Sequence, residues 1–198
     1  MVHYKYIEIG TSDFATLINK YPNDIGLSVE PIKSLLDNLP DKKNNTKVNY
    51  AISDKTGTAE FYKLKDEFLE DKEHRQYERG MSSLVGASNE EKRITKSVRF
   101  ERFEKINVPT KSLEDFFKEY HVESVEYLKL DTEGFDINIM NQLYRTNIRP
   151  KWIKFESCHS SEEEIKNILD CFSSYDVRRT KNDIYLNFIN TKNNVINK

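Results

Sequence analysis

The chain has 198 residues, of which 37% are hydrophobic and 32% charged, and its net charge is −2 at pH 7. This length allows one ordinary domain with a buried core, and the composition is that of a globular rather than a disordered chain. The near-zero net charge gives no overall attraction to nucleic acid or anionic membranes. No apolar run approaches the about 20 residues of a membrane-spanning helix.

Cysteine content and the first residues bear on the compartment. Cys158 and Cys171 are the two cysteines, too few for a disulfide framework. The chain begins directly with a strand-like segment and shows no signal-peptide pattern. These features favour a reducing compartment, and we expect a cytoplasmic protein without a membrane span.

The first part of the chain alternates between strand-like and helix-like patterns. Gly10 ends the first β-prone run, and Leu17, Ile18 and Tyr21 recur at helical spacing before Pro22 breaks the helix. We expect strands at residues 4–9, 26–29 and 48–52 and helices at residues 14–21 and 32–39. This β-α-β-α-β order predicts a parallel sheet with right-handed crossovers.

The pattern changes after the third strand. Residues 54–57 predict a turn and residues 59–62 an added hairpin strand. Residues 63–80 are crowded with charged side chains, which favours a solvated helix or loop over a functional lid. Another strand is expected at residues 99–108, and Ser112 has the position of a helix N-cap.

Strands and helices alternate again in the second half. We expect strands at residues 127–130, 152–155, 175–179 and 184–189, the last two antiparallel, and helices at residues 137–144 and 165–172. The end, residues 191–198, is rich in Asn and Lys and is expected to be a flexible tail. Residues 1–190 would then form a single domain.

Polar residues follow the predicted parallel strands. They are Glu8, Ser12 and Asp13 at the first strand, together with the glycine Gly10, then Glu30 at the second, Ser53 and Asp54 at the third, Asp131 at the fourth, and Glu156 and His159 at the fifth. Ligands of open α/β sheets bind at the carboxyl ends of the strands. We therefore expect these residues to lie around one site.

The residues after the first strand favour a ligand without phosphate. Gly10 permits a tight turn, but the later glycines of a dinucleotide-binding Gly-x-Gly-x-x-Gly motif are absent. Asp13 would repel a pyrophosphate at the start of the helix. S-adenosylmethionine instead carries cationic sulfonium and ammonium groups, which suit the carboxylates of Glu8, Asp13 and Asp131. Glu30 is placed to accept hydrogen bonds from ribose hydroxyls.

Several segments resemble the FkbM family of methyltransferases. The more specific ones are Asp-Thr-Glu-Gly at residues 131–134 and Ser-Asp-Lys-x-Gly-x-Ala-Glu-Phe at residues 53–61. Residues 6–14, 29–31 and 82–84 match in the same order. The resemblance extends from about residue 4 to residue 159, which is most of the chain.

The resemblance implies a Rossmann-like class I methyltransferase fold of the α/β class. Such a fold has a mostly parallel seven-stranded sheet with an antiparallel last strand, here with a β-hairpin or loop insertion after strand three. The resemblance also implies S-adenosylmethionine as donor and O-methylation, often of sugars. Carried over by position, the residues expected on the methionine part of the donor are Glu8, Gly10 and Asp13. Glu30 is expected on the ribose, and Ser53 and Asp54 on the adenine side. Ser12, beside Asp13, is also expected among the donor-binding residues.

Three side chains are candidates for the chemical step. Asp131, Glu156 and His159 are placed to take the proton of an acceptor hydroxyl. The simpler alternatives are a helix cap for Asp131 and an exposed loop residue for His159. Asp131 and Glu156 also offer oxygen ligands to Mg²⁺, whereas Cys158 beside His159 is a poor basis for zinc. No metal ligands are predicted.

Two other functions stay open from the residues alone. A non-catalytic binding module would keep the sheet and lose turnover, but the run of strand-end carboxylates disfavours it. An RNA methyltransferase would use the Arg and Phe side chains near residues 92–103, but the near-neutral charge counts against it. We expect a hydroxyl-bearing acceptor such as a carbohydrate.

Overall fold

The computed structural model describes residues 1–69, 82–84 and 102–189. Residues 70–80 of the charged segment, the start of the strand expected at 99–108, and the tail at 191–198 lie outside these ranges. Their expected structure therefore stays a prediction. Within the described ranges, no helix is long and apolar enough to cross a membrane.

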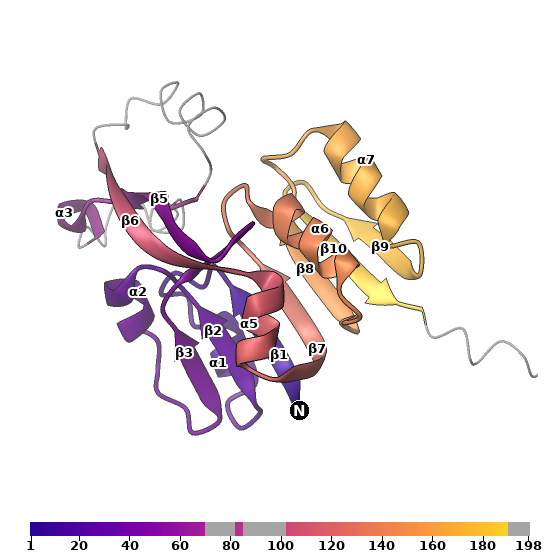
Figure 1. Cartoon of the computed structure of the whole chain (residues 1–198), viewed down its shortest axis with the longest axis horizontal. Helices are drawn as coiled ribbons and strands as arrows, with labels where there is room; N and C mark the ends of the chain where they lie inside the picture. The colour runs from indigo at the N-terminus through magenta and orange to yellow at the C-terminus, as the bar shows by residue number, and fades with distance from the viewer. Residues whose placement is uncertain (70–81, 85–101, 190–198) are drawn as a thin grey trace, which may run out of the picture.

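Seven strands form a large sheet in the order β3-β2-β1-β7-β8-β10-β9 (Figure 1). Their bounds are β1 Val2–Ile9, β2 Gly26–Val29, β3 Asn45–Val48, β7 Val122–Leu130, β8 Trp152–Glu156, β9 Tyr175–Arg179 and β10 Asp183–Phe188. Neighbours from β3 to β8 are parallel, whereas β10 is antiparallel to β8 and β9. The expected sheet is confirmed, and its strand order reverses between β1 and β7, where ligands of such sheets bind.

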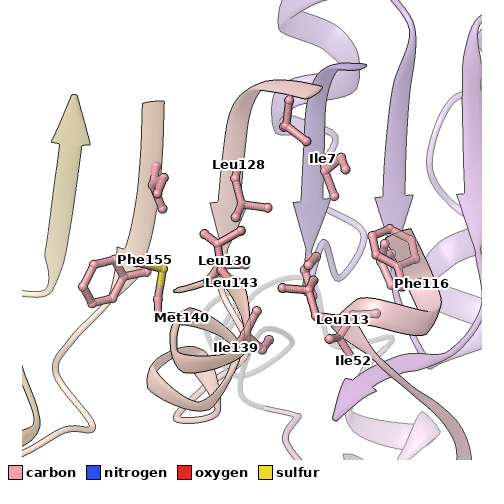
Figure 2. Close-up of a cluster of buried hydrophobic side chains, with 14 of the residues drawn as sticks. Ile7, Ile52, Leu113, Phe116, Leu128, Leu130, Ile139, Met140, Leu143 and Phe155 are labelled. Atoms are coloured by element: carbon pink, nitrogen blue, oxygen red, sulfur yellow. The ribbon is translucent and has the colours of Figure 1, made fainter. Parts of the chain in front are cut away.

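The main core lies between one face of this sheet and three helices (Figure 1). These helices are α5 Leu113–Glu119, α6 Asp136–Arg145 and α7 Glu162–Cys171. Figure 2 shows Leu128 and Leu130 of β7 near Met140 and Leu143 of α6. The period of two in the strand and 3.6 in the helix brings these side chains to facing surfaces. Ser112 accepts a hydrogen bond from the Asp115 backbone, which confirms it as an N-cap.

Two short helices lie elsewhere on the molecule. In α1, Thr16–Lys20, Leu17 and Ile18 pack with Tyr6 of β1, whose neighbour Ile7 belongs to the main core on the opposite face. In α2, Lys33–Asp37, Leu35 packs against the small sheet described next. Both helices are shorter than predicted, because their flanking turns take up the ends of the apolar runs.

A three-stranded sheet follows β3, in the order β4-β6-β5. Its strands are β4 Ala51–Ser53, β5 Gly57–Leu64 and β6 Phe103–Ser112, and α3 Asp66–Leu69 follows β5. The single strand predicted at 48–52 was wrong, because the chain leaves the large sheet after Val48 and starts β4 at Ala51. Asn49 fixes the segment between β3 and β4, because its side-chain amide donates hydrogen bonds to the carbonyls of Glu30 and Pro31, at 3.0 and 2.9 Å.

Candidate active site

A narrow hollow lies at the carboxyl ends of β1, β2 and β7, beside the small sheet. Its empty space is about 470 Å³, part of it open to solvent. Its polar lining includes Gly10, Ser12, Glu30, Asp131 and Thr132, and its apolar lining includes Pro31, Leu35, Ala51, Phe61 and Leu84. The hollow therefore suits a ligand with one charged end and one apolar, ring-like end.

Gly10 lets the turn after β1 approach β7 closely. Its φ is +80°, in the left-handed region that favours glycine. A Cβ atom built on Gly10 would lie 2.0 Å from the backbone oxygen of Asp131. No other residue type fits here without moving one of the two strand ends, and the tight turn predicted at Gly10 is confirmed.

Glu30 holds the turn after β1 to the end of β2. Its carboxylate is buried and accepts hydrogen bonds from the backbone N–H groups of Ser12 and Ile32, at 2.8 and 2.9 Å. Burial raises the pKa of Glu30 to about 7, although the two N–H donors act in the opposite direction. Ser12 is itself buried with φ +47°, so both residues shape the polar wall of the hollow.

Glu8 does not line the hollow but lies in the sheet beneath it. It is 1% exposed, and its carboxylate accepts from the Lys129 ammonium at 2.7 Å and from the Leu17 N–H at 3.1 Å. Lys129 also lies 3.3 Å from Asp131. Burial lowers the pKa of Lys129, but the Glu8 and Asp131 carboxylates more than offset this, so it is raised. The Glu8–Lys129 pair thus supports Asp131 from below.

The other predicted donor-binding residues do not line the hollow. Asp13 is half-buried and absent from the lining residues. The Ser53 hydroxyl donates to the Asp54 carboxylate at 3.0 Å, and the Ser53 carbonyl accepts from Gln142 of α6 at 2.9 Å. Asp54 is exposed and lines a separate surface hollow with Gln142. The part of this segment that reaches the hollow is instead Ala51 and Ile52, slightly earlier in the chain.

Carboxylates and one histidine gather next to the hollow at the ends of β7 and β8. The Nε2 atom of His159 lies 3.0 Å from a Glu156 carboxylate oxygen and 3.2 Å from one of Glu133. These three side chains are only 14–16% exposed. Ligand atoms of Asp131, Glu133 and Glu156 lie within 4.8 Å of one another. Asp131 therefore belongs to both the hollow and this cluster.

Asp136 holds the two strand ends of the cluster together. It is 1% exposed and accepts from the Thr132 N–H at 3.1 Å, the Thr132 hydroxyl at 2.6 Å and the Glu156 N–H at 3.1 Å. Burial raises its pKa to about 7. The N-cap of α6 is Phe135, so neither Asp131 nor Asp136 caps this helix. The helix-cap alternative for Asp131 is thereby excluded.

The structure brings Gly10, Ser12, Glu30 and Asp131 around the hollow and Glu156 and His159 beside it. Sequence reasoning left Lys129 out of the site and left a role for Glu133 open. A lysine inside the apolar run of β7 was a usable signal for the first, because such a charge needs a buried partner. For Glu133 the signal was its place in the Asp-Thr-Glu-Gly segment.

The fold and the site define an α/β protein with a hollow at the switch point of its sheet and a carboxylate–histidine cluster beside it. The profile of the family described as Methyltransferase FkbM domain matches residues 8–180. The chain belongs to this family, and its fold is the Rossmann-like fold of class I methyltransferases.

Comparison with individual proteins adds no functional argument. No curated protein matches the chain significantly. The crystal structure of a fibrillarin/Nop5p complex overlaps with a TM-score of 0.41 at 10% sequence identity, over 93% of this chain and 71% of that chain. A likeness this loose carries no conclusion about activity or partners.

Proposed function

We propose that this protein transfers a methyl group from S-adenosylmethionine to a hydroxyl of a sugar or related glycan. The observation that carries the proposal is Asp131, which lies at once on the wall of the hollow and in the cluster with Glu133 and Glu156. A donor in the hollow and an acceptor at the cluster would then meet at this residue. Family membership supports methyl transfer as the reaction.

The chemistry of the hollow supports this donor over a phosphate-bearing one. Glu30 and Asp131 place carboxyl groups on its polar wall, which disfavours the negatively charged pyrophosphate of a dinucleotide. The apolar wall, with Pro31, Ala51 and Phe61, suits the adenine ring. The bound donor supplies a methyl group on a sulfonium, and Gly10 allows the backbone to approach it closely.

The cluster supports oxygen as the methylated atom. Carboxylates and a histidine accept hydrogen bonds from a hydroxyl, and one of them takes its proton during the transfer. A positioned general base contributes about 10²–10⁴-fold to such a rate, and we assign this role to Asp131, Glu156 or His159. Orientation of donor and acceptor is the other contribution that the residues make.

The same cluster also supports a role for Mg²⁺. Carboxylate oxygens are the ligands that this ion prefers, and those of Asp131, Glu133 and Glu156 are close enough to share one ion. Glu156, Cys158 and His159 form an overlapping group with a sulfur and a nitrogen, which suits softer metals. An ion here would bind and orient the acceptor hydroxyl.

The test is ligand-dependent thermal unfolding with S-adenosylhomocysteine, NAD, and S-adenosylhomocysteine with MgCl₂. We expect S-adenosylhomocysteine at about 100 times its Kd to stabilise the fold by about 2.7 kcal/mol, and NAD to have no effect. Stabilisation by NAD alone would refute the donor assignment. Donor binding without methyl transfer to any sugar, glycan or RNA would favour a binding module, and transfer to RNA would favour the nucleic-acid alternative.

A further inference from the structure

Ser83 connects the small sheet to the loop that follows β7. It is 1% exposed and pairs with Tyr62 of β5 through two backbone hydrogen bonds, at 2.9 and 3.0 Å. Its hydroxyl donates to the backbone carbonyl of Glu133 at 2.9 Å. Any residue type at this position would make the backbone bonds to Tyr62, so the hydroxyl contributes the bond to Glu133 in particular.

The hydrogen bond from Ser83 to Glu133 joins two segments that both line the hollow. Ser82 and Leu84, on either side of Ser83, line the donor hollow from the small sheet. Thr132, next to Glu133, lines it from the large sheet. The distance between these walls therefore depends on how Ser83 holds the loop after β7.

The loop that Ser83 holds has an unusual backbone. Glu133 has φ +55° and Gly134 has φ +111°, both in the left-handed region. A non-glycine residue in this region is strained and needs local support. The turn sends the Glu133 side chain toward His159, where the two groups lie 3.2 Å apart. A bond to the Glu133 carbonyl thus acts on both the hollow and the cluster.

We propose that Ser83 is a positioning residue, which sets the spacing of the donor hollow and the placement of Glu133 through its hydroxyl. The inference rests on the proposed function, because it takes the hollow to be the donor site. Loss of the hydroxyl leaves the β5 pairing intact but releases the loop, and the partly buried Glu133 carbonyl loses a donor. We expect the affinity for the donor product to fall about tenfold, which corresponds to about 1.4 kcal/mol.

The experiment is calorimetric titration of S-adenosylhomocysteine into the wild-type chain, Ser83→Ala and a matched control, Thr110→Val. Thr110 also has a buried hydroxyl in the small sheet that donates to a backbone carbonyl, that of Lys55 at 3.0 Å, but it does not line the hollow. Each variant's Tm is measured in parallel. We expect similar Tm losses in the two variants and a loss of affinity in Ser83→Ala alone.

Three results would overturn the inference. Wild-type affinity in Ser83→Ala would show that the hydroxyl is not needed, and an equal affinity loss in Thr110→Val would show general loosening. If the wild type itself does not bind S-adenosylhomocysteine, the proposed function fails together with this inference. Should Ser83→Ala not fold, Ser83→Cys replaces it, since a thiol fills similar space and donates weakly. We expect Ser83→Cys to lose affinity as well.

Discussion

The buried carboxylates of the site accept hydrogen bonds from nearby donors. Glu8 has the Lys129 ammonium and a backbone N–H, Glu30 has two backbone N–H groups, and Asp136 has Thr132 and the Glu156 N–H. Burying a carboxylate without such partners costs several kcal/mol. These residues therefore stabilise the loops around the hollow only as long as their donors stay in place.

Glu30 makes the stability of the fold depend on pH. Its pKa is about 7 in the folded protein against an ordinary 4.5. The folded state therefore binds this proton more tightly, and its stabilising contribution is full below pH 4.5 and lost as the pH rises through about 7. Between pH 5 and pH 8, Glu30 is expected to lower the unfolding free energy of the wild type by up to about 3 kcal/mol. We expect Glu30→Gln to lack this part of the decrease.

Urea unfolding at a series of pH values measures this effect. Asp136, whose pKa is also raised to about 7, adds a fall of its own in both proteins. The informative quantity is therefore the difference between wild type and Glu30→Gln. Asp37→Asn, at an exposed carboxylate, is the control for removing one negative charge from the surface. Parallel curves for wild type and Glu30→Gln would contradict the prediction.

Asp131 is the residue at which donor and acceptor would meet. Its pKa is raised by burial, and Lys129, 3.3 Å away, works against this rise. Asp131→Asn keeps the shape of the side chain and removes its charge. We expect the fold to persist, S-adenosylhomocysteine affinity to change little, and methyl transfer to fall about 10²-fold or more.

Transfer of labelled methyl groups from S-adenosylmethionine to a mixture of sugars and glycans measures this turnover. If donor affinity falls first and turnover recovers at saturating donor, Asp131 holds the ammonium group of the donor instead. Turnover equal to that of the wild type would remove Asp131 from the chemistry altogether.

At the scale of elements, the contact between the ends of β1 and β7 decides whether the hollow forms. Gly10→Ala combines a left-handed residue with a Cβ placed 2.0 Å from the Asp131 oxygen. Gly57 in β5 is a matched control, since its φ is also positive, +153°, but a Cβ there meets nothing within 4 Å. The two variants separate backbone strain from lack of space.

We expect Gly57→Ala to lower the unfolding free energy by about 1–2 kcal/mol at most and Gly10→Ala to lower it by a further ~1–3 kcal/mol because of overpacking. Chemical denaturation measures both values. Gly10→Ala should also lose binding of S-adenosylhomocysteine, whereas Gly57→Ala should keep it. Equal losses of stability in the two variants would contradict the prediction, because they would mean that the ends of β1 and β7 move apart at little cost.

At the scale of the whole molecule, two sheets share the site. The large sheet supplies Gly10, Glu30 and Asp131, and the small sheet with its neighbours supplies Phe61 and Leu84. The insertion after the third strand was predicted as a hairpin or loop. In the structure it is a three-stranded sheet, and its residues line one side of the hollow. The sequence prediction joined β4 to the end of β3 in one strand at 48–52, because Ala51–Ser53 is too short to show an alternation of its own.

The sequence by itself determined the large parallel sheet, the antiparallel last strand, the N-cap Ser112 and the edge at which polar residues gather. These depend on local periodicity and on the rule that parallel strands end at one edge. Only the tertiary structure decided which of those residues face the hollow. Glu8 turns to Lys129 of a neighbouring strand, and Ser53 turns to Gln142 of a helix. Such partners come from strand register and packing between distant segments, which a local pattern does not record.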